Sequence, residues 1–443
     1  MKKRRLVSML LVVIMILVSF TACSSKPKTT GSNGASEPKE QTEQNTNPGT
    51  SDVTLTVAIW DKNQEPGLKQ IMNDFTEQTG IKCDIQITPW KDYWTMLEAA
   101  TTGGNMPDVF WMHSFQVNTY AQYDDILLDV SDQISKSDKI DLSKFPKDLV
   151  KLYQNAEGKQ VGIPKDVDTS AVWYNKDMFD EAGIPYPTAD WTWDDFREIS
   201  KKLTKSDGSQ YGLAMKPNSD QESWYSLVYA YGGKIISDDM TKSGFDDPKT
   251  VEALKMVENI VKDGSMPDYA ALAENDTTAL MEAGTVAMTF QGSWMVSELN
   301  NNDFLKQHAA VAPLPKGENG TCSMYNGLAW SASAQGKHTE EAWKLMEYLG
   351  SKEAQQKQAE LGVTMAAYEG ISEAWSKSQE GFDLTPYLDM MDGAVLYPHS
   401  KNTTVWYTVM TELLVNLWDG SRTAEDICAE FTEFMNEALA NEQ

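Results

Sequence analysis

Residues 286–299 read Val-Ala-Met-Thr-Phe-Gln-Gly-Ser-Trp-Met-Val-Ser-Glu-Leu. From Val286 to Phe290, apolar side chains alternate with small or polar ones, which is the period of a β-strand. Gly292 ends this alternation, and the residues after Trp294 read as the start of a helix. The stretch predicts a strand-to-helix turn that carries Trp294, the place where open α/β proteins hold ligand-facing groups. The alternative is that Trp294 packs beneath the helix as a core residue.

Strands and helices alternate at the start of the folded part of the chain. Apolar periodicity predicts strands over 54–59, 81–87 and 107–111, with helices over 66–79 and 93–102 between them. This order is typical of a parallel sheet with helices on both faces. The chain ends in two helices, predicted over 405–418 and 423–440.

The first residues have the pattern of an export signal. Four basic residues precede the apolar run 6–20, and small residues lead up to Cys23. The Ala22-Cys23 junction resembles a bacterial lipobox, although Phe20 stands where that motif usually has Leu. We expect a signal peptide over 1–22, a lipid on Cys23, and a protein held on the outer face of the cell membrane. The alternative is an ordinary cleaved signal peptide, which also gives an exported protein.

Composition limits the remaining possibilities. Residues 24–51 contain no large apolar side chain, so 23–51 is expected to be a flexible tether behind the lipidated cysteine. About 390 residues follow, enough for two lobes. The net charge of −27 becomes −31 without the four basic residues of the signal, which argues against nucleic acid and against binding to acidic lipid by charge. Three scattered cysteines (Cys83, Cys322, Cys428) give neither a metal spacing nor a disulfide framework.

The sequence shows no catalytic signature. It has no phosphate-binding Gly-Lys loop, no nucleophile elbow and no zinc-type histidine pair, and it contains only four histidines. Its 65 acidic residues make chance pairs of carboxylates common, so a glycosidase remains an alternative. We expect a protein that is not an enzyme and needs neither a cofactor nor a metal.

Aromatic residues are abundant, with fourteen Trp and seventeen Tyr, and several fall at strand ends and glycine turns. Indole and phenol rings stack on the apolar faces of sugars, while planar polar groups bind the hydroxyls. The candidate ligand-binding residues on these grounds are Trp60, Asp61, Trp111, His113, Asp166, Asp168, Trp224, Trp294, Asn326 and Gly327.

The chain resembles the family 1 extracellular solute-binding proteins, the lipoprotein receptors of bacterial sugar ABC importers, which are distantly related to maltose-binding proteins. The resemblance covers roughly residues 52–443. It rests on Gly162-Ile163-Pro164 with Trp173-Tyr174-Asn175-Lys176-Asp177, Thr192-Trp193-Asp194-Asp195-Phe196, residues 284–294, and Trp406-Tyr407.

The resemblance implies an α/β fold of the periplasmic-binding-protein type II, with two hinged lobes and a ligand cleft between them. Lobe 1 would take 52–163 plus 328–372, and lobe 2 would take 164–327 plus 373–443. Trp294 and Trp406 match positions where maltose-binding relatives stack sugars, and Asp168 lies where they place a hydrogen-bonding Glu. Trp60-Asp61 matches the first-strand contact. Ser114-Phe115 replaces an Asp-Arg pair of those relatives, which argues against maltose itself.

We therefore expect an extracellular lipoprotein that captures a carbohydrate, in particular an oligosaccharide, and delivers it to the transmembrane permease subunits of an ABC importer. We expect it to act as a monomer. The alternatives are the same fold with another polar solute, such as a polyamine or glycerol phosphate, and a secreted glycosidase. The acidic chain favours the polyamine between the two solutes, since no basic cluster suits a phosphate.

Overall fold

The structure is a computed structural model that describes residues 52–442. The predicted signal peptide, the predicted lipidation site Cys23 and the predicted tether lie outside the described residues. None of the helices within 52–442 combines the length and the hydrophobicity that a membrane span requires.

A five-stranded sheet contains the predicted β-α-β-α-β unit. Its strand order is β2-β1-β3-β9-β4, with bounds Thr54–Ile59 (β1), Lys82–Ile87 (β2), Val109–Met112 (β3), Ile163–Pro164 (β4) and Ala329–Ala332 (β9). Strand β1 pairs in parallel with β2 and β3, as predicted, whereas β9 is antiparallel to both β3 and β4. The predicted parallel unit is therefore confirmed, and a strand from much later in the chain completes the sheet.

A second sheet has the order β6-β5-β7 and is antiparallel throughout. Its strands are Ser170–Asn175 (β5), Met288–Gly292 (β6) and Ala309–Ala312 (β7). The short strands Met324–Tyr325 (β8) and Val395–Leu396 (β10) pair separately. Strand β6 and the helical turn after it are the strand-to-helix feature predicted over 286–299.

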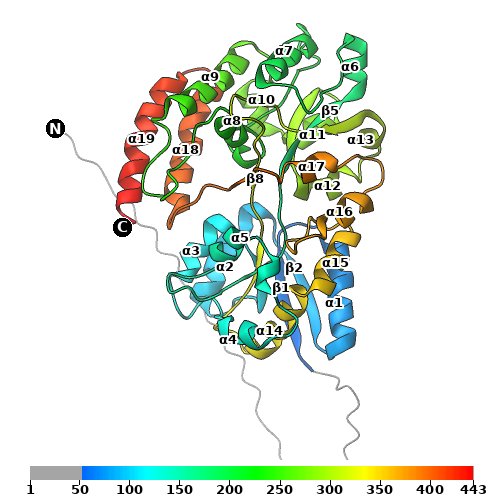
Figure 1. The fold of residues 1–443 in the computed structure, drawn as a ribbon, viewed down its shortest axis with the longest axis vertical. Coiled ribbons are helices and arrows are strands. Elements are labelled where there is room, and N and C mark those ends of the chain that lie inside the picture. Colours follow the sequence, from blue (N-terminus) through cyan, green and yellow to red (C-terminus); the bar gives the residue numbers. More distant parts are fainter. Residues whose placement is uncertain (1–51, 443) are drawn as a thin grey trace, which may run out of the picture. The chain divides into compact units, whose positions relative to one another are not determined.

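The helices divide between the two sheets (Figure 1). Those of the first half are α1 (Glu65–Thr79), α2 (Trp90–Gly103), α3 (Ser114–Ala121), α4 (Ser131–Lys136), η1 (Leu142–Lys144), α5 (Lys147–Leu152), α6 (Lys176–Ala182), α7 (Trp193–Leu203), η2 (Asp220–Trp224) and α8 (Tyr225–Ala230). Next come α9 (Pro248–Lys262), α10 (Tyr269–Glu274), α11 (Thr277–Glu282), η3 (Ser293–Met295), α12 (Val296–Leu299), α13 (Asp303–His308) and α14 (Thr339–Leu349). The last are α15 (Lys352–Glu360), α16 (Ser372–Ser378), α17 (Thr385–Asp389), α18 (Thr403–Trp418) and α19 (Ala424–Ala440).

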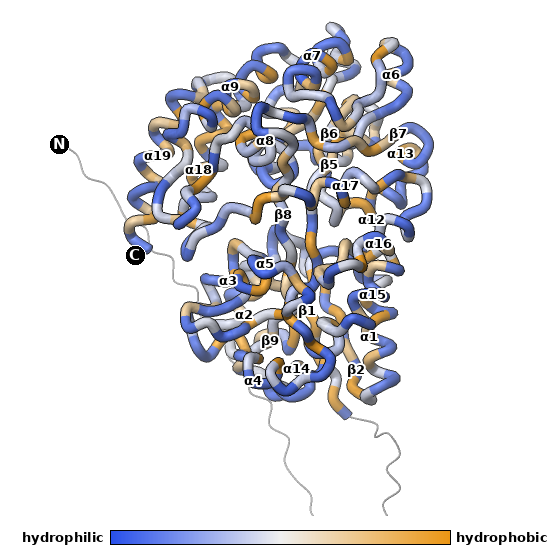
Figure 2. Tube along the Cα trace, in the orientation of Figure 1, coloured by the Kyte–Doolittle hydropathy of each residue, from blue (hydrophilic) through white to orange (hydrophobic). Residues whose placement is uncertain are grey.

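Both faces of the first sheet are buried. Leu55, Val57 and Ile59 of β1 contact one apolar cluster, together with α1 and α14, and Ala58 faces the other. The second sheet packs against α11, α13 and α17, while α9, α18 and α19 form a layer of their own. Figure 2 shows apolar stretches along the strands of both sheets. Two sheets with separate helical layers make the two-lobed α/β fold that was expected; the lobe boundaries stay a prediction.

Candidate functional site

A cavity of about 430 Å³ lies where the ends of β1, β3 and β6 meet turn η2 and helix α18, a size typical of small-molecule sites. Among the predicted site residues, the cavity wall contains Trp60, Asp61, His113, Asp166, Asp168 and Trp294. It also contains Gln64, Trp90, Phe115, Val167, Asn218, Asp220, Gln221, Glu222, Ser293, Met295, Leu328, Thr364, Tyr397 and Tyr407.

One wall is aromatic. Trp60 directly follows β1, and its ring meets Trp90 edge-on at a centroid distance of 5.0 Å. Trp90 in turn contacts His113 and Phe115, at 5.4 and 5.6 Å. Phe115 stacks on Tyr407 of α18 with an angle of 16° between the rings. Trp90 keeps 41% of its surface exposed, so this wall offers open ring faces to a ligand.

Trp294 is placed by the glycine two residues before it. A Cβ atom added to Gly292 would lie 2.2 Å from Cη2 of the indole, so the ring covers the glycine backbone. Gly292 itself has φ −76° and ψ 154°, a conformation open to any residue. Its small size is therefore what the turn needs, because the indole occupies the space of a side chain.

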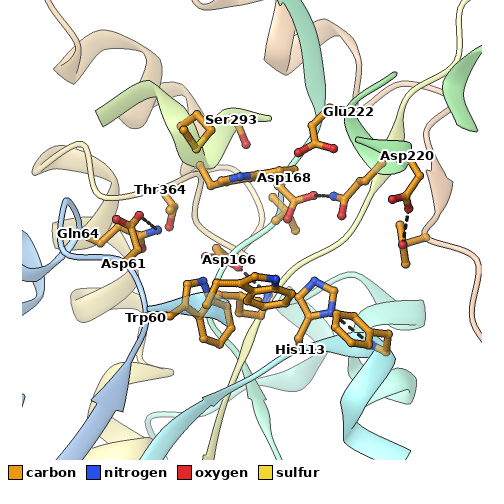
Figure 3. A pocket seen from close by; sticks show the side chains of 18 of the residues that line it. Trp60, Asp61, Gln64, His113, Asp166, Asp168, Asp220, Glu222, Ser293 and Thr364 are labelled. Atoms are coloured by element: carbon orange, nitrogen blue, oxygen red, sulfur yellow. Dashed lines mark hydrogen bonds between the residues drawn. The ribbon is translucent and has the colours of Figure 1, made fainter. Parts of the chain in front are cut away.

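The opposite wall is acidic (Figure 3). Asp220 and Glu222 lie on η2, a π-helical turn that leads into α8, and π-turns often occur at functional sites. The Tyr397 and Tyr407 hydroxyls donate to the two oxygens of Asp220, at 2.5 and 2.9 Å. Within 52–442, the hydrogen bond that acts on the Glu222 carboxyl group comes from its own backbone N–H and not from another residue.

Asp166 and Asp168 come from the connection between β4 and β5. Asp166 accepts from the ammonium of buried Lys165 at 2.6 Å and from the backbone N–H of Leu328 at 2.7 Å. Asp168 accepts through one oxygen, from the Gln221 amide at 2.6 Å and from the backbone N–H of Asn326 at 3.0 Å. The Lys165 ammonium is not available to a ligand, since it also donates to two other polar side chains and lies over an indole ring.

Burial decides the charge of several of these groups. It lowers the pKa of His113 to about 3, so this imidazole is neutral at neutral pH. Burial raises the pKa of Asp220 to about 6, against the lowering effect of its two tyrosine donors. Burial and the charge of Asp220 raise the pKa of Glu222 to about 8. Burial and the charge of Asp166 also raise the pKa of Asp168. Glu222 is therefore mostly protonated near neutral pH, because no compensating positive charge from the described residues lies beside it.

Three predicted tryptophans have fully buried side chains and do not line the cavity. Trp111 lies inside β3 rather than at its end, where its ring packs on Trp330. Trp224 turns away from the cavity and donates to the carbonyl of Pro217. Trp406 faces the core and donates to Ser400, and the next residue on α18, Tyr407, takes the place in the wall. Trp224 and Trp406 thus point into the core from elements whose other residues line the cavity, whereas Trp111 lies behind Trp60, whose ring meets it edge-on at 4.8 Å.

Asn326 and Gly327 lie behind the wall. Asn326 is 1% exposed, and its amide nitrogen lies 3.1 Å from Nε2 of His113. A Cβ atom on Gly327 would lie 2.0 Å from the carbonyl oxygen of Asp166, so the two connecting segments cross closely there. Both residues support wall residues rather than form the surface of the cavity.

Sequence reasoning missed Trp90, Asp220, Glu222 and Tyr407 among others. Trp224 is among the predicted residues, but a π-turn that directs neighbouring acidic residues into a cavity has no sequence signature of its own. Tyr407 could have been found by treating Trp406-Tyr407 as a pair. No group of potential metal ligands occurs in the described part of the chain.

Comparison with known proteins gives consistent matches. The model of the family "Bacterial extracellular solute-binding protein" matches residues 61–356. The galactooligosaccharide-binding protein of Bacillus subtilis is 26% identical, over 67% of this chain and 69% of that protein. The multiple sugar-binding protein of Streptococcus mutans is 24% identical, over 72% of this chain and 76% of that protein.

Among solved structures, an ABC substrate-binding protein of Listeria monocytogenes in complex with cycloalternan superimposes with a TM-score of 0.80. It is 23% identical, and the match covers 88% of this chain and all of that one. This likeness confirms the two-lobed fold, and the family model confirms the resemblance inferred from the sequence. The chain belongs to the bacterial extracellular solute-binding protein family.

Proposed function

We propose that this protein captures a carbohydrate in the cavity between Trp60 and Trp294, and that it delivers the sugar unaltered to the permease of an ABC importer. The observation that carries this proposal is the pairing of an aromatic wall with a wall of planar polar groups. Aromatic faces stack on sugar rings, and carboxylates and amides accept from sugar hydroxyls. Relatives named for sugar and galactooligosaccharide binding support the same class of ligand, and an oligosaccharide in particular.

A thermal-shift panel tests this proposal. A ligand that binds only the folded protein raises its melting temperature. Mono- and oligosaccharides should therefore include at least one that stabilises the protein, while glycerol 3-phosphate should not, because no lysine or arginine lines the cavity within 52–442. Glycerol 3-phosphate belongs in the panel because one relative is named as a glycerol-3-phosphate-binding protein. Stabilisation by this compound and by no saccharide would contradict the proposal.

We also propose that the bound sugar is not hydrolysed. A glycosidase needs two carboxyl groups free to exchange protons or attack the sugar. Asp61, Asp166 and Asp220 accept hydrogen bonds from the protein on both oxygens, which leaves free oxygens in the wall on Asp168 and Glu222. The support for binding without hydrolysis is therefore the family model, which describes solute-binding proteins. We expect a bound oligosaccharide to be recovered intact, and steady release of reducing ends would contradict this.

The anchor is proposed on the sequence alone. We propose that Cys23 carries a lipid that holds the monomeric receptor on the outer face of the membrane. Cys23→Ala should release the protein from the membrane fraction and abolish lipid labelling, whereas Cys83→Ala should change neither. Unchanged partitioning of Cys23→Ala would contradict the anchor.

A further inference from the structure

The charges around the cavity do not balance. Five carboxyl groups line it, from Asp61, Asp166, Asp168, Asp220 and Glu222, and no lysine or arginine does so among the residues that the structure describes. The nearby ammonium of a buried lysine forms its ion pair with Asp166. The histidine in the wall is neutral, as its lowered pKa requires. At most one of the five carboxylates therefore has a cationic partner.

Hydrogen bonds distinguish the carboxyl groups that the fold uses from those that it leaves free. Asp61, Asp166 and Asp220 accept from the protein on both oxygens. Asp168 accepts through Oδ1 only, although its side chain is just 9% exposed. Glu222 has no partner in another described residue, and Figure 3 shows its carboxyl group directed into the cavity. The free acceptors are thus Asp168 Oδ2 and the Glu222 carboxylate.

The walls around these acceptors determine what can satisfy them. A buried carboxylate is normally paired with a cation or kept protonated. A sugar hydroxyl would supply a hydrogen bond but no positive charge, so Glu222 would stay mostly protonated near neutral pH. An ammonium group supplies both the hydrogen bond and the charge that allows the carboxyl group to ionise. Two indole rings, those of Trp60 and Trp294, line the cavity and favour a ring-shaped ligand over a linear polyamine.

We infer that the ligand is an amine-bearing carbohydrate, with its ammonium group held by Glu222 and Asp168 and its ring against the aromatic wall. This inference rests on the proposed carbohydrate function and narrows it to a charged class of sugar. The amine is recognised as a cation, so an N-acetylated counterpart, which is neutral, binds more weakly.

Matched saccharides test the inference by calorimetric titration. Each set carries an ammonium, an acetamido or a hydroxyl group on the same ring carbon: glucosamine, N-acetylglucosamine and glucose; the corresponding galactose set; and the β-1,4-linked glucosamine, N-acetylglucosamine and glucose disaccharides. In at least one set the amine should bind about tenfold more tightly than both neutral members, which is the margin of a charge-assisted over a neutral hydrogen bond. Added salt should reduce this margin.

A variant tests whether the tighter binding of the amine depends on the Glu222 carboxylate. Glu222→Gln keeps the shape of the side chain and removes its charge, so the amine and the hydroxyl member should then bind alike. Glu77→Gln, an exposed position near the end of α1, should leave the margin intact. A melting temperature no lower than that of the wild type shows for each variant that the fold is retained.

The outcomes separate this inference from the proposed function. If a neutral member binds as tightly as its amine, or if no amine binds, the inference is overturned while any bound neutral sugar still supports the receptor. If spermidine binds and no saccharide does, both are overturned. Loss of the margin in Glu77→Gln as well would overturn the assignment to Glu222.

Discussion

The indole of Trp294 reaches the cavity because the position two residues before it has no side chain. The ring lies over the backbone of Gly292, which ends strand β6, and the chain then enters a short helical turn. The sequence identified Trp294 from the break in strand periodicity, and the structure places it in the cavity wall. The close approach to Gly292 was beyond prediction, because it depends on the rotamer of the indole.

Gly292→Ala should displace the indole of Trp294 without straining the backbone. The new Cβ atom would lie 2.2 Å from Cη2, so the ring must move, and ligand affinity should fall by roughly tenfold as one stacking contact is lost. Calorimetric titration with the most stabilising saccharide checks this. Gly336→Ala is the matched control, since its added Cβ would meet nothing closer than 3.5 Å. Equal affinities for both variants and the wild type would contradict the role of Gly292.

The unpaired carboxyl group of Glu222 should make the stability of the ligand-free protein depend on pH. Burial, with the charges of Asp220 and Asp276, raises its pKa from the ordinary 4.5 to about 8. Between these two values the folded protein holds a proton that the unfolded chain has lost. The free energy of unfolding should therefore fall as the pH rises through this window, by at most about 1.4 kcal/mol per pH unit for one group.

Denaturant unfolding of the wild type and Glu222→Gln across this pH range measures that effect. Gln does not titrate, so the variant should gain stability relative to the wild type as the pH rises, and the difference should level off above about pH 8. Other groups titrate in both proteins, so their contributions largely cancel in the difference between the two free energies of unfolding. A difference that does not vary with pH would contradict the raised pKa.

At the scale of elements, the parallel unit β1-α1-β2-α2-β3 was predictable because its pattern is local. Apolar alternation, Pro66 near the start of α1 and the glycine at its end all lie within 60 residues of one another. The antiparallel strand β9 was not predictable, because its partners Val109–Met112 precede it by more than 200 residues. The acidic wall could not be predicted for the same reason, because its residues are far from the aromatic residues in sequence and approach them only in the folded chain.

Helix α7 begins with a capping box. The hydroxyl of Thr192 accepts from the backbone N–H of Asp195, and the Asp195 carboxylate accepts from the backbone N–H of Thr192. Thr192→Ala should lower the free energy of unfolding by about 1 kcal/mol, because one helix N–H loses its acceptor. Denaturant unfolding measures this loss. Thr192→Ser keeps the hydroxyl and should restore most of the stability, whereas equal losses for the two variants would assign the effect to packing instead.

At the scale of the whole molecule, residues from both sheets meet around one cavity. Asn63, after β1, donates to the carboxylate of Glu298 on α12 at 2.8 Å. Asn118 of α3 donates to the carbonyl of Ser400, just before α18, at 3.1 Å. Such contacts between segments far apart in the chain fit an arrangement that encloses a solute. The family and the two-lobed fold were predicted correctly from motifs dispersed along the chain. Only some of the residues in the cavity wall were predicted, because a core tryptophan and a cleft tryptophan look alike in sequence.

The affinity of Trp294→Ala for the most stabilising saccharide, measured beside its melting temperature without ligand, tests the central claim most directly. If Trp294 stacks on a sugar, the variant should bind roughly ten- to a hundredfold more weakly and melt close to the wild type. Trp406→Ala is the control for a core tryptophan, and it should lose about 3–5 kcal/mol of stability. A much lower melting temperature for Trp294→Ala with normal affinity in the folded fraction would contradict a carbohydrate site at this cavity.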